Sequence, residues 1–280
     1  MSEVRRLLTE AATILSAAGV PAPEYDARVL LAHALGVELG RLSLVEEVSA
    51  SVRERFTELV EQRAQRIPLQ HLTGVAHFRT ISVAVGPGVF TPRPETELLA
   101  GWAIERAADL PAPVVVDLCT GSGVIAKAIA VEVPNAQIHA VELDPDALIW
   151  AQSNLFGTGV DLSQADLAHA LPELAGWVDV VVCNPPYVPL TAFDGVDREA
   201  REHDPALALF SGEDGLEAMR ALERRARHLL RPGGWMGAEH ADVQGESAPA
   251  IFSGSGHWEQ VRDHRDLAGR ARFVTARLAR

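Results

Sequence analysis

The residues with the clearest capacity for chemistry are Asn184-Pro185-Pro186-Tyr187, which directly follow an apolar run over residues 178–183. The length and β-branched content of that run predict a strand buried on both faces of a parallel sheet. Because the two prolines lack backbone N–H groups, they end the strand and drive the preceding residue to extended geometry. Asn184 is therefore predicted to lie beyond the carboxyl end of the strand, where open α/β sheets bind ligands.

The groups in this run suit a planar NH₂ group. The side-chain oxygen of Asn184 and the carbonyl of Pro185 are hydrogen-bond acceptors, and Tyr187 offers an aromatic face. An amide or arylamine nitrogen is a poor nucleophile, but two acceptors on its hydrogens favour the electron-rich, pyramidal nitrogen of a transition state. Beside a nucleoside-type site, the run would predict methyl transfer to such a nitrogen without a strong general base. Taken alone, the same run also fits a proline-rich strand end with a packed tyrosine.

A glycine turn lies upstream, in Asp117-Leu118-Cys119-Thr120-Gly121-Ser122-Gly123, between a predicted strand and a predicted helix. Gly121 and Gly123 allow a ligand to approach the backbone closely. The turn differs from the dinucleotide fingerprint because Ala126 replaces the third glycine. The acidic Asp117 suits the cationic end of an amino acid better than a pyrophosphate.

Two further carboxylates follow the next two predicted strands. Glu142 ends a strand about twenty residues after the glycine turn, which is where a carboxylate accepts both hydroxyls of a ribose. Asp166 follows a short third strand and could accept from the amino group of an adenine. Each of these residues, standing alone, would also fit an ordinary acid at a strand end or a turn.

The elements that must position these residues divide the chain into three parts. Apolar residues at helical spacing predict a helical bundle over residues 1–72. Short alternating segments punctuated by glycine and proline predict a β-hairpin linker over residues 73–92. From residue 93 to residue 280, strands and helices alternate, which predicts a doubly wound α/β sheet. The strands are expected at residues 114–118, 137–143, 178–183, 234–239, 258–262 and 272–278, besides the short one before Asp166.

Local signals predict where two helices begin. Ser51 with Glu54 fits a capping box that opens the third helix of the bundle. The run over residues 91–97 opens another helix, with Pro94 near its first turn. Arg93 and Glu95 in that run either cap the helix or line the mouth of the site, and spacing alone leaves both readings open.

Composition narrows the function classes. The 280-residue chain has a net charge of −13, which argues against a protein that mainly grips a phosphate backbone. Its two cysteines lie in apolar contexts, which favours buried thiols in a reducing compartment over disulfides. Without a signal sequence or an apolar run of membrane length, a cytoplasmic location is expected, with no membrane partner. The histidines have no metal-ligand spacing, so no metal is expected.

The order of these motifs resembles class I S-adenosylmethionine-dependent methyltransferases that modify planar nitrogens, and within them the release-factor glutamine methyltransferases (PrmC/HemK family). Segments outside the catalytic core carry the closer resemblance. These are Gln70-His71-Leu72-Thr73-Gly74, Thr91-Pro92-Arg93-Pro94-Glu95-Thr96-Glu97, Glu202-His203-Asp204-Pro205, Gly212-Glu213-Asp214-Gly215 and Asp266-Leu267-Ala268-Gly269-Arg270. The resemblance covers nearly the whole chain and is weakest over residues 1–66.

The resemblance implies a seven-stranded Rossmann-like domain, with an antiparallel last strand, behind a small helical domain that docks the substrate. It also implies methylation of the glutamine amide in the Gly-Gly-Gln loop of class I peptide-chain release factors, with S-adenosyl-L-methionine as donor and S-adenosyl-L-homocysteine as product. Asn184, Pro185 and Tyr187 would be catalytic, and Pro186, Arg93 and Glu95 would join them in binding the substrate. The expected donor site comprises Asp117, Cys119, Thr120, Gly121, Ser122, Gly123, Glu142, Asp166, Leu167 and Asn184.

Three positions depart from the family pattern. Cys119 replaces a usual glycine in the donor turn, and Leu167 replaces an aromatic residue that often packs on adenine. Ala241 replaces the glycine of a late E-x-G-x-x-Q pattern, which here runs from Glu239 to Gln244. None of these departures falls within the run from Asn184 to Tyr187.

Two other functions use the same motifs. Methylation of the exocyclic amine of adenine in a nucleic acid uses the same Asn-Pro-Pro-Tyr chemistry, but the negative charge and the absence of a basic target-recognition segment argue against it, so no nucleic-acid substrate is expected. A protein that binds the donor without catalysis would work through its helical domain. The intact Asn184 argues against that function.

Overall fold

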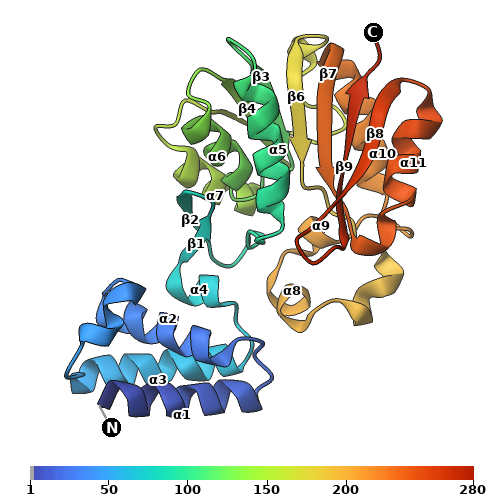
Figure 1. The fold of residues 1–280 in the computed structure, drawn as a ribbon. Helices are drawn as coiled ribbons and strands as arrows, with labels where there is room; N and C mark the ends of the chain where they lie inside the picture. Colours follow the sequence, from blue (N-terminus) through green and yellow to red (C-terminus); the bar gives the residue numbers. More distant parts are fainter. Residues whose placement is uncertain (1–2) are drawn as a thin grey trace. The chain divides into compact units, whose positions relative to one another are not determined.

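The structure is a computed structural model that describes residues 3–280 (Figure 1). The chain forms two compact units. One, here called the helical unit, contains the chain up to Val75 together with Asp197–His203. The other, the sheet unit, contains Ala76–Val196 and Asp204–Arg280. The domain boundaries predicted at residues 72 and 92 stay a prediction, and residues 197–203 group with the helical unit.

The helical unit is built of helices around one apolar core. Its elements are α1 (Glu3–Ala17), α2 (Pro23–Leu35), the 3₁₀ helix η1 (Leu39–Leu44), α3 (Ala50–Ala64), α4 (Leu69–Thr73) and α8 (Arg198–His203). Local signals mark both ends of α2: Pro23 stands at its start, and Gly36 ends it with φ 67° and an N–H that donates to helix carbonyls. Leu15, Leu30 and Leu31 are fully buried in the core.

The predicted capping box of α3 is wrong. The helix begins at Ala50, and its N-cap is Ser49, whose Oγ accepts from the N–H of Val52 at 3.3 Å. Ser51 lies inside the first turn, where its hydroxyl contacts Ser49 Oγ at 3.1 Å. Both serines lie just before the apolar residues of the same helix. The prediction chose Ser51 because Glu54 follows it by three residues, but the cap is Ser49.

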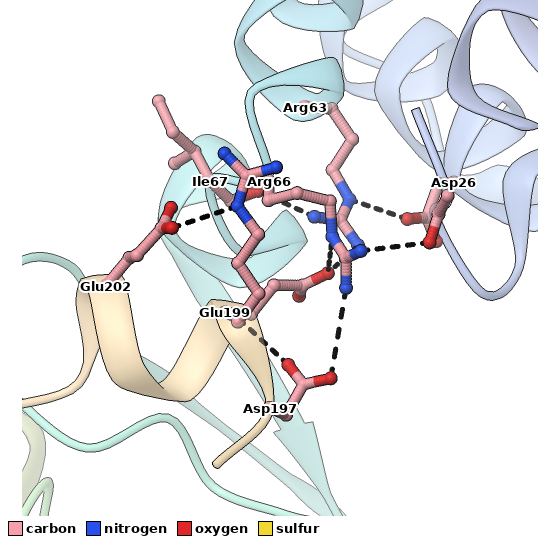
Figure 2. Close-up of polar contacts among 9 residues, drawn as sticks. Asp26, Arg63, Arg66, Ile67, Asp197, Glu199 and Glu202 are labelled. Carbon is pink, nitrogen blue, oxygen red and sulfur yellow. Dashed lines mark hydrogen bonds and ion pairs between the residues drawn. The ribbon is translucent and has the colours of Figure 1, made fainter. Parts of the chain in front are cut away.

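A buried ionic network, here called the arginine cluster, joins α2, α3 and α8 within the helical unit (Figure 2). Arg63 Nε donates to Asp26 at 2.7 Å, and Arg63 Nη2 donates to Glu199 at 2.8 Å. Arg66 Nε donates to the same Glu199 oxygen at 2.8 Å, and its Nη1 donates to the carbonyl of Gly19 at 2.9 Å. The side chain of Arg63 is only 4% exposed, so its charge depends on these partners rather than on water.

The sheet unit contains a seven-stranded sheet with strand order β5-β4-β3-β6-β7-β9-β8. The strands are β3 (Val114–Leu118), β4 (Gln137–Glu142), β5 (Asp161–Gln164), β6 (Val178–Cys183), β7 (Leu230–Glu239), β8 (Trp258–Arg265) and β9 (Ala271–Leu278). The last strand, β9, pairs antiparallel with β7 and β8, whereas β3 to β7 pair in parallel. A separate two-stranded sheet pairs β1 (Val75–Phe78) with β2 (Ile81–Ala84) inside the stretch predicted as a hairpin linker, and the linker role and its bounds stay a prediction.

Helices cover both faces of the large sheet, as Figure 1 shows. On one face α5 (Thr96–Ala108), α6 (Val124–Glu132) and α7 (Pro145–Leu155) pack over Val180 and Val182 of β6. On the other face α10 (Glu217–Leu229) and α11 (Ser247–Ser255) pack over Val181 and Cys183. Alternate residues of one apolar strand thus enter two different cores, as expected for a strand buried on both sides. The predicted doubly wound α/β domain with a helical N-terminal domain is confirmed.

Some element boundaries differ from prediction, since β7 begins at Leu230 rather than at residue 234 and β8 extends to Arg265 rather than to residue 262. The helix expected from the run over residues 91–97 begins at Thr96, so Pro94 precedes its first turn, and Thr96 N–H donates to the carbonyl of Arg93. A 3₁₀ turn, η4 (Asp242–Gln244), precedes α11. Short connections η2 (Pro172–Leu174), η3 (Leu190–Gly195) and α9 (Ala206–Leu209) complete the unit. Among residues 3–280, no helix is long and apolar enough to cross a membrane.

Candidate active site

A cavity in the sheet unit opens at the carboxyl ends of β3, β4 and β6. Most of the predicted site residues line it, namely Cys119, Thr120, Gly121, Ser122, Glu142, Asp166, Leu167, Asn184, Pro186 and Tyr187. Five other predicted residues do not, namely Asp117, Gly123, Pro185, Arg93 and Glu95. The three parallel strands therefore bring the glycine turn, the strand-end acid and the Asn-Pro-Pro-Tyr run together, as the sequence predicted.

Asp117 stabilises the glycine turn by accepting hydrogen bonds from it and from the helix that follows. This fully buried carboxylate accepts from the hydroxyl of Thr120 at 2.6 Å and from the N–H of Ala126 at 3.1 Å, both at Oδ2. Its Oδ1 is buried without a hydrogen-bond partner in the described part of the chain. Burial raises the pKa of Asp117 to about 7, and these two donors oppose the rise.

Cys119 adopts a backbone conformation that favours glycine. Its φ is 57°, in the left-handed region, where a Cβ approaches the following carbonyl. Gly121 and Gly123 share that region, and a Cβ on Gly123 would lie 2.9 Å from the side chain of Leu155. The departure of this chain from a glycine-rich turn therefore places a side chain at a strained position on the wall of the cavity.

Glu142 is already held by the backbone. Its Oε2 accepts from the N–H of Gly121 at 2.7 Å, and its Oε1 accepts from the N–H groups of Leu143 and Asp144 at 2.8 and 2.9 Å. Burial nevertheless raises the pKa of this carboxyl, and the three N–H groups oppose the rise. A carboxylate has about four acceptor positions, so one remains for a ligand hydroxyl beside the three N–H groups.

Asp166 and Leu167 line the same cavity beyond β5. Asp166 Oδ1 accepts from the N–H of Ala168 at 2.8 Å, so the carboxylate also shapes its own turn. Asp166 is exposed and Leu167 is half-buried. The arrangement can offer a planar ligand one carboxylate oxygen at its edge and one aliphatic side chain at its face.

The Asn-Pro-Pro-Tyr run continues from β6 into a tethered loop. The N–H groups of Tyr187 and Val188 both donate to the carbonyl of Leu209, at 3.1 and 2.8 Å. The side-chain amide nitrogen of Asn184 donates to Thr96 Oγ1 at 3.4 Å. The hydroxyl of Tyr187 donates to Glu239 Oε1 at 3.2 Å. Both polar side chains of the run are therefore engaged from outside it.

Arg93 and Glu95 lie in ion pairs rather than on the cavity wall. Arg93 Nη2 donates to the buried Asp204 at 2.5 Å, and its guanidinium lies 5.0 Å from the ring centroid of Phe90. Glu95 pairs with Arg270 at 3.5 Å. The structure thus joins the segments around Arg93 and Asp204, which are far apart in the sequence, and the role of Arg93 and Glu95 in substrate binding stays a prediction.

Sequence analysis missed Thr96, Glu239 and Gln244. Thr96 Oγ1 donates to Glu239 Oε2 at 2.7 Å. Gln244 Nε2 donates to the carbonyl of Tyr187 at 3.0 Å. The sequence signal that could have pointed to Glu239 and Gln244 was the late pattern that runs between them. That pattern alone does not indicate that both residues contact Tyr187.

Ionisable groups around the cavity show raised pKa values. Burial raises the pKa of Glu239 to about 7, although the hydroxyls of Thr96 and Tyr187 and the charge of Arg272 oppose the rise. Burial, together with the adjacent Glu239, raises the pKa of the Tyr187 phenol. Clusters of this kind concentrate at functional sites, because a folded protein otherwise avoids burying unpaired carboxylates.

Two family profiles match the chain. One, described as PrmC N-terminal domain, matches residues 6–74. The other, described as Methyltransferase small domain, matches residues 86–195. The second match contains the glycine turn, Glu142, Asp166 and the Asn-Pro-Pro-Tyr run. The fold and the site thus define a methyltransferase with an added N-terminal helical domain.

Full-length relatives identify the family. A release factor glutamine methyltransferase of Streptomyces coelicolor is 53% identical, over 97% of this chain and 97% of that protein. One from Mycolicibacterium smegmatis is 46% identical over the whole of both chains. The chain therefore belongs to the release factor glutamine methyltransferase family. A further relative, of Streptomyces pristinaespiralis, is a 4-amino-L-phenylalanine/4-methylamino-L-phenylalanine methyltransferase, 42% identical over 91% of this chain and 88% of that protein.

Solved structures support the fold. A 16S rRNA N2 G1207 methyltransferase of T. thermophilus, in complex with AdoMet and guanosine, is similar with a TM-score of 0.53 and 21% identity, over 74% of this chain and 50% of that one. A methyltransferase of Pyrococcus furiosus has a TM-score of 0.50 and 17% identity, over 70% and 87% of the two chains. At these identities the likeness extends to the fold alone.

Proposed function

We propose that this enzyme methylates the side-chain amide nitrogen of the glutamine in the Gly-Gly-Gln loop of class I peptide-chain release factors. The proposed methyl donor is S-adenosyl-L-methionine. The observation that carries the proposal is the placement of Asn184 and Tyr187 on the wall of a cavity shared with the glycine turn and Glu142. A hydrogen-bond acceptor for a planar NH₂ group and a candidate binding site for the methyl donor thus share one cavity.

The residues present fit the donor. Asp117 keeps one buried oxygen without a partner beneath the glycine turn, which suits the cationic amino group of an amino acid. Glu142 retains acceptor capacity for a ribose, and Asp166 and Leu167 suit the edge and the face of an adenine. The donor supplies an electrophilic methyl group on a sulfonium sulfur.

The residues of the chain then orient the acceptor. The side-chain oxygen of Asn184 and the carbonyl of Pro185 accept the two amide hydrogens, and Tyr187 packs against the amide plane. The amide nitrogen forms a bond to the methyl carbon while the carbon–sulfur bond breaks, and the bonding pair stays on sulfur. The nitrogen then loses one proton to water, which leaves N-methylglutamine and S-adenosyl-L-homocysteine. Positioning and hydrogen bonding, rather than a strong base, provide the rate enhancement.

A second candidate acceptor is a free aromatic amine. The Streptomyces pristinaespiralis relative acts, by its name, on 4-amino-L-phenylalanine and is 42% identical to this chain. An arylamine NH₂ is planar and has a delocalised lone pair, so the same two acceptors and aromatic face suit it. The higher identity to the Streptomyces coelicolor protein favours the release factor.

The test is transfer of labelled methyl from S-adenosyl-L-methionine with four acceptors offered separately. These are a purified class I release factor, its Gln→Ala loop variant, 4-amino-L-phenylalanine and duplex DNA. We expect label on the intact release factor and none on the loop variant. Label on the free amino acid alone would replace the proposal with small-molecule arylamine methylation. Label on DNA would point to the exocyclic amine of a base, such as adenine, as the acceptor.

A further inference from the structure

A hydrogen-bonded chain links Asn184 to a buried carboxylate outside the Asn-Pro-Pro-Tyr run. Asn184 Nδ2 donates to Thr96 Oγ1, and Thr96 Oγ1 donates to Glu239 Oε2 at 2.7 Å. Glu239 lies at the end of β7 and is 2% exposed. Among residues 3–280 it forms no ion pair, and the nearby Arg272 is paired with Asp266 at 2.9 Å. The carboxylate therefore interacts mainly with hydroxyl groups that serve the site.

We propose that Glu239 is a positioning residue that fixes, through Thr96, which end of the Asn184 amide faces the acceptor. The inference rests on the proposed function, because it assigns an acceptor role to the Asn184 oxygen. It deepens that function by naming what holds the oxygen in place. Neither Thr96 nor Glu239 needs to touch the reacting atoms.

The number of available protons determines which group donates and which accepts in the hydrogen bonds from Asn184 through Thr96 to Glu239. An ionised carboxylate can only accept, so the single hydroxyl proton of Thr96 points to Glu239. Thr96 Oγ1 can then only accept from Asn184, which must present its NH₂ group to Thr96. The Asn184 oxygen is left on the opposite side of the amide, available to a substrate N–H. The orientation of the amide thus follows from the charge on Glu239.

The same carboxylate also holds the aromatic side of the site. Its second oxygen accepts from the hydroxyl of Tyr187, while Gln244 donates to the Tyr187 carbonyl. Gly215, which has φ 74°, leaves room for this contact, since a Cβ there would lie 2.4 Å from the Tyr187 carbonyl oxygen. The end of β7 and the turn after it therefore fix both the acceptor amide and the aromatic face.

Protonation of Glu239 would reverse the direction of these hydrogen bonds. A proton on Oε2 would be donated to Thr96 Oγ1, and the Thr96 hydroxyl would then donate to the oxygen of Asn184. Burial raises the pKa of Glu239 to about 7. The Thr96 hydroxyl, Arg272 of β9 and the Tyr187 hydroxyl lower it, and Glu95, just before α5, raises it. The turnover rate is accordingly expected to rise with pH through this range as the carboxylate forms.

The experiment compares Thr96→Val, Thr96→Ser and Glu239→Gln with the wild-type enzyme. Thr96→Val keeps the side-chain shape but removes the hydroxyl, and Thr96→Ser restores it. We expect Thr96→Val to lower kcat roughly 10- to 100-fold, as loss of supporting hydrogen bonds does elsewhere, while the donor Kd stays within twofold. Thr96→Ser should keep kcat near the wild-type value. Glu239→Gln should remove the rise of kcat with pH.

The assays use whichever methyl acceptor the wild-type enzyme labels. Failure of the proposed function can therefore be told apart from failure of the role assigned to Glu239. Label on an acceptor other than the release factor removes the proposed function and still leaves the Thr96 pair to be compared. A wild-type enzyme that labels its acceptor, beside a Thr96→Val variant with unchanged kcat, would overturn the role of Glu239. Equal loss in Thr96→Val and Thr96→Ser would do the same. Donor binding by each variant establishes that it is folded.

Discussion

The two units of the protein bury carboxylates in opposite ways. In the helical unit, Glu199 and Asp26 lie against Arg63, which is within 2.8 Å of both. In the sheet unit, Asp117 and Glu239 form no ion pair in the described part of the chain and are held by hydroxyl and N–H groups. The paired carboxylates sit between helices, whereas Asp117 and Glu239 accept hydrogen bonds from residues that line the cavity, namely Thr120, Thr96 and Tyr187.

The difference distinguishes buried carboxylates that stabilise the fold from buried carboxylates that serve the candidate site. Opposite charges in the arginine cluster neutralise one another, and the hydrogen bond and charge of Arg63 oppose the rise that burial causes in the pKa of Asp26. Asp117 and Glu239 form no ion pair in the described part of the chain, although the charge of Arg272 lowers the pKa of Glu239, and burial raises the pKa values of both carboxyls to about 7. Their remaining acceptor capacity and adjustable charge are available to a ligand or to a neighbouring side chain.

Breaking the arginine cluster should have the largest effect. Arg63→Met would leave Asp26 and Glu199 buried without their shared cation, and we expect the free energy of unfolding of the helical unit to fall by about 3–5 kcal/mol. Urea unfolding followed by a spectroscopic probe measures the change. Arg198→Met, in an exposed pair with Glu202 on the same unit, is the matched control and should unfold like wild type. Equal unfolding midpoints for Arg63→Met and wild type would contradict a structural role.

Asn184→Ala should have the next largest effect, and on catalysis alone. Loss of a transition-state acceptor is expected to lower kcat about 10²–10³-fold, with donor affinity largely retained. Steady-state kinetics beside calorimetric donor binding separates the two quantities. Asn135→Ala, which removes only hydrogen bonds to the carbonyls of Leu110 and Pro111, provides the control. Near-normal turnover by Asn184→Ala would refute the mechanism.

Glu142→Ala is expected to act on the donor instead. Removing a carboxylate that would accept from a ribose hydroxyl should weaken donor binding by about 1.5–3 kcal/mol, the range for hydrogen bonds to charged groups. Isothermal titration with S-adenosyl-L-homocysteine measures the affinity. Glu132→Ala, at an ion pair with Arg79 away from the cavity, is the control. Unchanged affinity in Glu142→Ala would remove the ribose assignment.

The unpaired carboxylates should also make stability depend on pH. The pKa of Glu239 in the folded state, about 7, lies above its ordinary value of 4.5, so the folded state binds the proton more tightly. Its contribution is fully present below about 4.5 and is lost as pH rises through about 7. Glu239→Gln should flatten this decline in denaturant unfolding measured between pH 5 and pH 8, in the range set by that pKa. An identical decline in the variant would assign it to other groups such as Asp117.

The smallest effect is expected at Cys119. Because its φ of 57° disfavours a side chain, Cys119→Gly should raise the free energy of unfolding by about 1 kcal/mol. Cys119→Ala, which keeps the Cβ, should give no such gain. Thermal unfolding of the two variants tests the comparison. A stabilised alanine variant would point to the sulfur rather than to the backbone.

Local patterns predicted the sheet and the cavity because the relevant information is local. A strand that ends in Asn184-Pro185 and a glycine turn after Leu118 are both readable from a few neighbouring residues. Parallel pairing then brings them together, as Leu118 lies opposite Cys183 in the sheet. The strand-end positions of the site followed from that rule alone.

The supporting contacts were not predictable because they join distant residues. Thr96 and Glu239 are 143 positions apart, and Arg63 and Glu199 are 136 positions apart. Nothing in the neighbourhood of either residue indicates its partner. The cap at Ser49 was missed for a different reason, since two serines offered nearly equivalent local signals and only the backbone distinguishes them.

The membership of α8 in the helical unit has a consequence for modularity. The chain passes between the units at three peptide bonds, after Val75, after Val196 and after His203. A fragment that stops at Val75 would retain Arg63 and Arg66 but lose Glu199, which both of them bind. The helical unit is therefore not a cassette that can be excised or grafted as one continuous stretch. A chimera between relatives would have to exchange α8 along with the first 75 residues.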